Sequence, residues 1–147
     1  SRLDMKEDIR VVQGVTSSIS AAASLGAPLM HDFCQISLSD LMTDWSLIEK
    51  RLELASMADF VICIYNPKSK GRPNHLRRAF EIMQAHKPAT TPVGIVKNAG
   101  RINEEKYIRT LETMDFEVCD MSTMIIVGNK ETYIDGDKII TPRGYGI

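Results

Sequence analysis

Apolar residues along this chain gather into short runs separated by polar turns, a pattern typical of alternating strands and helices. Residues 60–65 are apolar without interruption, which fits a strand buried on both faces. Similar but shorter runs predict further strands at residues 9–12, 33–38, 93–96 and 123–127. Residues 107–110 fit either a strand or the frayed start of a helix.

Three stretches between these strands have the spacing of helices with one apolar face. A hydroxyl at Thr16 or Ser17 can cap the first helix, and Gly26 ends it. Ser39 and Asp40 have the same capping character ahead of the second helix. The apolar stripes of the second and third helices are Leu41, Trp45, Ile48, Leu52 and Ala55, and Leu76, Ala79, Phe80 and Met83.

Near the C-terminus, Asp135 and Gly136 separate two short apolar stretches, residues 133–134 and 138–140. Asp-Gly favours the positive φ values of a tight hairpin turn, so these stretches predict an antiparallel hairpin. A hairpin also indicates that the sheet is mixed. We therefore predict one α/β domain with a mixed β-sheet of about five strands, flanked by helices and followed by a C-terminal hairpin.

The composition and charge of the chain are those of an ordinary domain and indicate no specialised class of protein. The 147 residues fit one domain, and the 44% hydrophobic content is enough for a core. A net charge of -1 gives no general attraction to nucleic acid or to an anionic membrane, and no apolar run is long enough to span a bilayer. Cys34, Cys63 and Cys119 are odd in number and far apart, which favours a reducing cytoplasm over a disulfide framework.

Polar turns follow several of the predicted strands, at residues 14–18, 65–74 and 97–101. Ligands of open α/β sheets bind beyond the carboxyl ends of strands, and small residues there let the main chain approach a polar ligand. Ordinary strand-to-helix turns prefer the same residue types. Each turn taken alone therefore leaves a structural and a ligand-binding interpretation open.

The second of these turns is densely basic. Lys68, Lys70 and Arg72 precede a predicted helix N-terminus, where the helix dipole opposes cations. A bound phosphate or carboxylate group would explain their placement, and a solvated loop is the alternative. The sequence has no Gly-x-Gly-x-x-Gly and no phosphate-loop lysine motif. The residues alone thus indicate an α/β domain with an anion-attracting face.

His31 lies next to Asp32 and close to Cys34, so a metal site or a proton-transfer pair has to be considered. A metal site needs more ligands at definite spacings, and we expect none. A His–Asp pair for proton transfer and a plain loop contact both remain open.

Eight short segments together resemble one family, the tetrapyrrole methylases. They occur in the family's order and spacing at residues 14–17 (Gly-Val-Thr-Ser), 26–29, 31–33, 36–41 (Ile-Ser-Leu-Ser-Asp-Leu), 65–69 (Tyr-Asn-Pro-Lys-Ser), 92–101, 127–129 and 141–145 (Thr-Pro-Arg-Gly-Tyr). Each segment alone is weak evidence for the family, whereas the ordered set is specific to it and extends over nearly the whole chain. The likeness is greatest to the members that methylate ring carbon 17 of precorrin-3B in cobalamin synthesis.

This resemblance implies a homodimeric two-domain enzyme that binds S-adenosylmethionine between its halves. It implies methyl transfer to carbon 17 of precorrin-3B, or of its cobalt form, with contraction of the ring. The cofactor contacts that it implies are Thr16, Ser17, Tyr65, Asn66, Asn98 and Ala99. The expected substrate contacts are Ser39, Asp40, Lys68, Lys70 and Arg72, with Asp40 and His31 as candidates for catalysis.

The family's N-terminal half carries a Gly-rich loop and a Gly-Asp-Pro element, which have no counterpart here. We therefore expect residues 1–147 to be the C-terminal domain, with the N-terminal domain absent. Such a domain supplies one wall of the cleft and is expected to be inactive alone. The alternatives are a non-catalytic module that binds anions or nucleotides, and a dimerisation module.

Overall fold

The computed structural model describes residues 17–68 and 73–144 of the chain, and the structural statements below concern these residues. Several features expected from the sequence lie outside them, namely the strand at residues 9–12 and the side chains of Thr16, Lys70 and Arg72.

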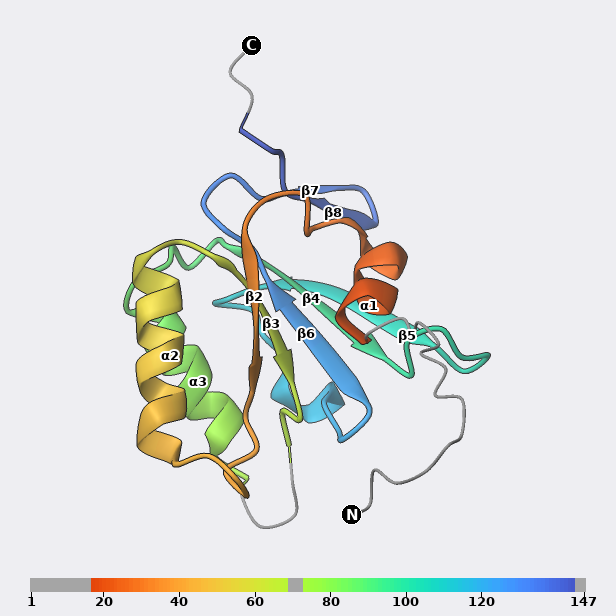
Figure 1. Ribbon diagram of the computed structural model, residues 1–147. Helices are drawn as coiled ribbons and strands as arrows, with labels where there is room; N and C mark the ends of the chain where they lie inside the picture. The colour runs from red at the N-terminus through yellow and green to blue at the C-terminus, as the bar shows by residue number, and fades with distance from the viewer. Residues whose placement is uncertain (1–16, 69–72, 145–147) are drawn as a thin grey trace, which may run out of the picture.

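A five-stranded mixed sheet forms the centre of the fold (Figure 1). Its order is β2 (Phe33–Ser37), β3 (Val61–Tyr65), β6 (Thr123–Val127), β4 (Pro92–Lys97) and β5 (Glu105–Thr110). β2 is parallel to β3, β6 is antiparallel to both β3 and β4, and β5 is antiparallel to β4. The predicted α/β class is confirmed, and residues 107–110 belong to a strand.

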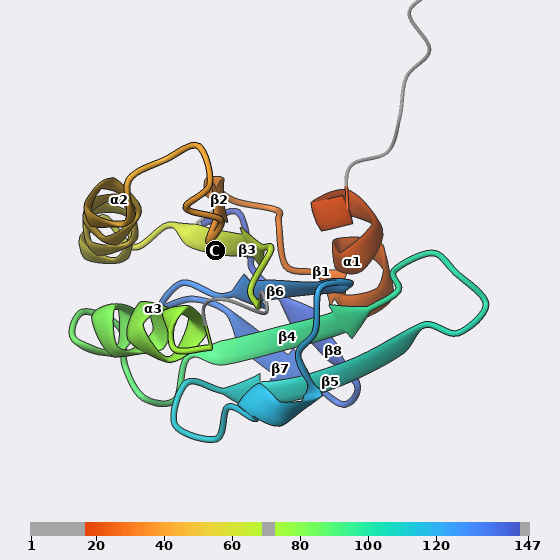
Figure 2. The same ribbon diagram turned by 90° about the horizontal axis from the view of Figure 1, so that it is seen from below.

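Helices cover both faces of this sheet (Figure 2). α2 (Trp45–Met57) and α3 (His75–Gln84) pack on one face, and α1 (Ser17–Leu25) packs on the other. Successive residues of a strand point to opposite faces. In β3, Ile62 and Ile64 accordingly join the core beneath α2 and α3, whereas Val61 and Cys63 join the core beneath α1. Burial on both faces explains why this strand is apolar throughout.

The C-terminal hairpin is confirmed but lies in a second sheet. β7 (Tyr133–Asp135) and β8 (Lys138–Ile140) are antiparallel, with Gly136 at a φ of 60° between them. β8 also pairs in parallel with β1 (Gly26–Ala27), which gives a three-stranded sheet. The main sheet is therefore mixed because of β5 and β6, not because of the hairpin. A strand of two residues leaves no periodic pattern that the sequence could reveal.

The start of α2 differs from the prediction. The residue that precedes α2 is Asp44, not Ser39 or Asp40, and Leu41 is 74% exposed instead of lying on the buried stripe. The pairing of β2 with β3 extends past the strand end, because the Leu38 N–H donates to the Tyr65 carbonyl over 3.1 Å. The chain therefore remains extended there, and a loop separates β2 from the helix.

α1 packs closely against the middle of the sheet because β4 carries a glycine where they meet. A Cβ on Gly94 would lie 2.4 Å from Leu25 Cδ1, so a larger residue fits only if the Leu25 side chain moves. This contact brings the first residue of α1, Ser17, toward the edge of the sheet where β4 ends.

Candidate functional site

One edge of the main sheet collects several chain turns with unusual backbone conformations. β3 and β4 are both antiparallel to β6, so their carboxyl ends lie at the same edge as the amino end of β6. β3 is followed by Asn66 and β4 by Asn98, with φ angles of 51° and 53°. Asparagine tolerates this left-handed region better than most residues, and strained backbone of this kind clusters at functional sites.

Hydrogen bonds fix both turns. Asn66 Nδ2 donates to Ser37 Oγ over 3.0 Å, which ties the end of β3 to the end of β2. The Asn98 N–H donates to the Ser122 carbonyl over 3.2 Å, which ties the end of β4 to the start of β6. The edge therefore presents a preformed arrangement of turns and not a set of independent loops.

A first hollow of about 280 Å³ lies between these turns. Ser17, Tyr65, Asn66, Asn98 and Ala99 line it, which brings together all the predicted cofactor contacts that the structure describes. The other lining residues are Arg101, Met121, Ser122, Thr123 and Met124. Its wall contains both apolar side chains and short polar groups, as suits a ligand with an apolar body and polar ends.

Met121, Ser122 and Thr123 were not among the site residues predicted from the sequence. Ligand contacts were expected only beyond the carboxyl ends of strands, whereas β6 reaches this edge by its amino end because it runs antiparallel to its neighbours. The signal available was the polar turn before residue 123, where Asp120 and Ser122 precede a strongly apolar strand. Strand direction alone decides whether such a turn lies at the site or at the far edge.

Asp120 organises the turn before β6. Its Oδ1 accepts hydrogen bonds from the Ser122 N–H (2.8 Å), the Ser122 hydroxyl (2.6 Å) and the Thr123 hydroxyl (3.0 Å). Lys97 Nζ lies 3.3 Å from its other oxygen. These hydrogen bonds, with the Ser122 hydroxyl first, lower the pKa of Asp120 from 3.8 to about 2. Lys97 in turn has a raised pKa, chiefly through its hydrogen bond to Asp120.

Replacing Asp120 with asparagine is expected to remove part of the acid sensitivity of folding. Because its folded pKa is about 2 and its ordinary value is 3.8, the carboxylate stabilises the fold above about pH 4 and loses this contribution as pH falls toward 2. The Asp120 side chain is about half exposed, so the asparagine variant should lose only about 1 kcal/mol of folding stability at neutral pH. Urea unfolding between pH 2 and pH 7 measures both effects.

The matched control for this variant is Asp137→Asn, because Asp137 is an exposed carboxylate that lies 3.6 Å from Lys106 Nζ at the surface. The control should keep the acid dependence of the parent. An Asp120→Asn variant that loses stability over the same acid range as the parent contradicts the role assigned to Asp120.

A second hollow of about 220 Å³ adjoins the first and shares Asn66 and Met121 with it. Ser39 and Lys68, two of the predicted substrate contacts, line this second hollow. The others in its wall are Leu38, Leu41, Pro67 and His75. Exposed apolar side chains and a cation thus meet in one wall, which suits a large apolar ligand with acidic substituents.

His75 connects Asp40 to the second hollow. The His75 ring stacks on Trp45 with 3.8 Å between ring centroids and 9° between planes. Its Nε2 lies 3.9 Å from Asp40 Oδ2, and both side chains are about one-fifth exposed. His75 was not among the site residues predicted from the sequence. No local signal pairs it with Asp40, because Asp40 lies in the loop after β2 and His75 is the first residue of α3.

The structure separates His31 from the other candidates. His31 precedes β2, whereas Ser39 and Asp40 follow it, so they lie at opposite edges of the sheet. His31 lines a different hollow of about 340 Å³, together with Asp59 and Gly144. Grouping His31 with Asp40 on one substrate face is therefore not supported by the fold.

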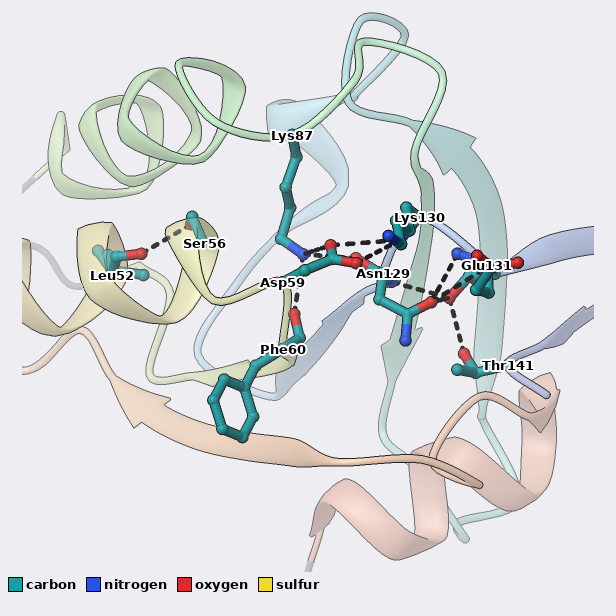
Figure 3. A network of polar contacts seen from close by, with 11 residues as sticks. Leu52, Ser56, Asp59, Phe60, Lys87, Asn129, Lys130, Glu131 and Thr141 are labelled. Atoms are coloured by element: carbon teal, nitrogen blue, oxygen red, sulfur yellow. Dashed lines mark hydrogen bonds and ion pairs between the residues drawn. The ribbon is translucent and has the colours of Figure 1, made fainter. Parts of the chain in front are cut away.

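A buried lysine holds that opposite edge together (Figure 3). Lys87 Nζ donates to the Phe60 carbonyl (2.8 Å) and the Gly128 carbonyl (2.9 Å) and lies 3.3 Å from Asp59 Oδ1. Burial lowers the pKa of Lys87, and the Asp59 charge opposes that shift. These partners come from the start of β3 and the end of β6, so Lys87 joins two strands of the sheet.

Within residues 17–68 and 73–144, no group of three or more His, Cys, Asp or Glu side chains is arranged to hold a metal ion. None of the helices in that part of the chain is both long and apolar enough to cross a membrane.

Comparison with known proteins gives consistent matches. Residues 2–115 match the family described as Tetrapyrrole (Corrin/Porphyrin) Methylases. The chain is 58% identical to the probable cobalt-factor III C(17)-methyltransferase of Salmonella typhimurium, over 99% of this chain and 60% of that protein. It is 45% identical to the precorrin-3B C(17)-methyltransferase of a Sinorhizobium species, over 94% of this chain and 56% of that protein.

The solved structures agree. The crystal structure of the methyltransferase CobJ superposes with a TM-score of 0.87 at 36% identity, over 92% of this chain and 56% of that one. Cobalt precorrin-4 methyltransferase CbiF, with a TM-score of 0.59 at 23% identity over 82% of this chain and 52% of that one, shares the fold. The chain thus spans somewhat more than half the length of these relatives.

Proposed function

Because this chain belongs to the tetrapyrrole (corrin/porphyrin) methylase family, we propose that residues 1–147 form the C-terminal domain of a methyltransferase of cobalamin biosynthesis. The whole protein transfers a methyl group from S-adenosylmethionine to carbon 17 of cobalt-factor III or precorrin-3B, with contraction of the ring. The observation that carries this proposal is the first hollow, which unites the predicted cofactor contacts from α1, β3 and β4.

The lining of the first hollow fits S-adenosylmethionine, which supplies a methyl group from its sulfonium when bound. Tyr65, Ala99 and Met121 offer surfaces on which the adenine packs. Asn66 and Asn98 offer amide groups for the hydroxyls of the ribose. These residues hold and orient the cofactor, which is the main requirement for a direct displacement.

The second hollow fits the macrocycle. It shares Asn66 and Met121 with the first, so donor and acceptor lie side by side at one edge of the sheet. Leu41 and Met121 are exposed apolar side chains that pack against a flat ring, and Lys68 suits its carboxylate substituents. Lys70 and Arg72 belong to the same proposal from the sequence, and they lie outside the described residues.

The chain covers 60% of its Salmonella relative, so a cleft between two domains would have only one of its walls in this chain. We place the remaining wall in an N-terminal domain that precedes Ser1, and the chain alone is then inactive. The whole protein is proposed to act as a homodimer in the cytoplasm. Support for the cytoplasm comes from Cys34, Cys63 and Cys119, which are all free thiols.

Methyl transfer by the whole protein tests the proposal. Methyl-labelled S-adenosylmethionine is incubated with cobalt-factor III and, separately, with precorrin-3B, and the labelled product is located by mass spectrometry. We expect one label per macrocycle with at least one of the two substrates, and none with residues 1–147 alone. Absence of transfer to both substrates, together with stabilisation by nucleotides and not by S-adenosylhomocysteine, would instead support a nucleotide-binding module.

A further inference from the structure

The wall of the first hollow contains one cation that has not yet been given a role. Among the described residues that line this hollow, Arg101 is the one that carries a charge, and it is exposed to solvent. None of the carboxylates in residues 17–68 and 73–144 lies within ion-pair distance of it. A guanidinium stays charged at physiological pH and binds carboxylates through two parallel hydrogen bonds. Arg101 therefore fits an anionic group of the ligand in this hollow.

The turn that carries Arg101 has a fixed backbone. The Arg101 N–H donates to the Asn98 carbonyl over 3.0 Å, and Gly100 has a φ of 77°. Glu104 Oε1 accepts hydrogen bonds from the Gly100 N–H over 2.8 Å and from the Ser24 hydroxyl over 2.7 Å. Ser24 belongs to α1, so the turn is tied to the helix that contributes to the same hollow. The base of the Arg101 side chain is therefore held at the hollow, while its charged end can meet a ligand.

The proposed cofactor has a single anionic group. In S-adenosylmethionine the sulfonium and the α-ammonium are cations, the adenine and the ribose are neutral, and the α-carboxylate alone is negative at neutral pH. A guanidinium attracts this carboxylate and repels the two cationic groups. Charge-assisted hydrogen bonds between guanidinium and carboxylate are also among the strong ones in proteins. The amino-acid part of the cofactor therefore offers Arg101 one favourable partner.

The position of Arg101 in the sheet suits that partner. Arg101 follows β4, whereas Asn66, which lines both hollows, follows β3, and β6 lies between these two strands. Arg101 lines the first hollow and does not line the second. A carboxylate held by Arg101 thus leaves the second hollow open to the macrocycle, whose own carboxylates are assigned to Lys68.

We infer that Arg101 binds the carboxylate in the methionine part of S-adenosylmethionine, and so makes the first hollow selective for the complete cofactor over adenosine compounds that lack this group. This inference rests on the proposed function. The carboxylate takes no part in the bonds that form and break during methyl transfer. Loss of its partner should therefore raise KM for S-adenosylmethionine and leave kcat unchanged.

Isothermal titration of the whole protein with two matched ligands tests this role. Decarboxylated S-adenosylhomocysteine differs from S-adenosylhomocysteine only in lacking the carboxylate. The Arg101→Gln variant is expected to bind S-adenosylhomocysteine at least about tenfold more weakly than the parent, and to bind the decarboxylated compound as the parent does. Arg101→Lys keeps the charge but not the paired donors, so it should recover part of the affinity.

The matched control is Arg51→Gln on α2, because Arg51 is exposed and lines neither hollow. It should bind both ligands as the parent does, and thermal melting shows that each variant is folded. If Arg101→Gln binds S-adenosylhomocysteine as tightly as the parent, the carboxylate contact is overturned while the proposed function stands. An equal loss of affinity for both ligands overturns it too, since Arg101 would then contact the adenosine. If the parent binds neither ligand and transfers no methyl group, the proposed function fails and this inference fails with it.

Discussion

Replacing Lys87 with methionine is expected to lower the free energy of unfolding by about 3 kcal/mol, which would be the largest stability loss among the changes considered. Methionine keeps most of the length of the unbranched side chain but has no hydrogen to donate. The Lys87 side chain is 1% exposed, so water cannot replace it at the Phe60 and Gly128 carbonyls. The loss of stability is smaller than for a fully buried ion pair, because the Asp59 side chain is 31% exposed to water. Its carboxylate also still accepts the hydrogen bonds from the Lys130 N–H.

Urea unfolding of the Lys87→Met variant measures this effect. Lys50→Met on the exposed side of α2 is the matched control and should change the stability by less than about 0.5 kcal/mol. An Asp59→Asn variant separates the ion pair from the carbonyl contacts, since asparagine tolerates the φ of 58° at this position. Equal stability of the Lys87 and Lys50 variants would show that the buried ammonium does not hold β3 and β6 together.

Replacing Asn66 with valine is expected to weaken the binding of S-adenosylhomocysteine to the whole protein by at least about tenfold, equal to 1.4 kcal/mol or more. Valine is strongly disfavoured at a φ of 51°, so the turn after β3 has to move. The change also removes the hydrogen bond from Nδ2 to Ser37 Oγ. Because Asn66 lines both hollows, the displaced turn disturbs cofactor and substrate together. The cost in stability should be about 2 kcal/mol.

Isothermal titration of S-adenosylhomocysteine measures the affinity, and two further variants separate the causes. Asn66→Gly removes the side chain without backbone strain, so it should remain as stable as the parent to within about 1 kcal/mol yet bind less tightly. Asn103→Val changes an exposed turn residue with an ordinary φ and should leave both properties unchanged. Unaltered affinity in the Asn66→Val variant would remove this turn from the cofactor site.

Most elements of the fold were predictable because they leave local patterns. The uninterrupted run at residues 60–65 identifies β3, since a strand buried on both faces must be apolar at every position. The stripe from Trp45 to Ala55 identifies α2 through helical spacing, although it does not show where the helix begins. Asn66 and Asn98 stand directly after strands, so their position at the carboxyl ends of β3 and β4 could be predicted once those strands were recognised.

Other parts of the site depend on pairing between distant segments, which no local pattern records. The amino-acid sequence by itself determined the α/β class and the family, and its resemblance to that family predicted the proposed cofactor contacts that directly follow strands. The tertiary structure decided that β6 is antiparallel, and so placed Met121 and Ser122 at the site. It also decided that Asp40 meets His75 and not His31, because the two ends of β2 lie at opposite edges of the sheet.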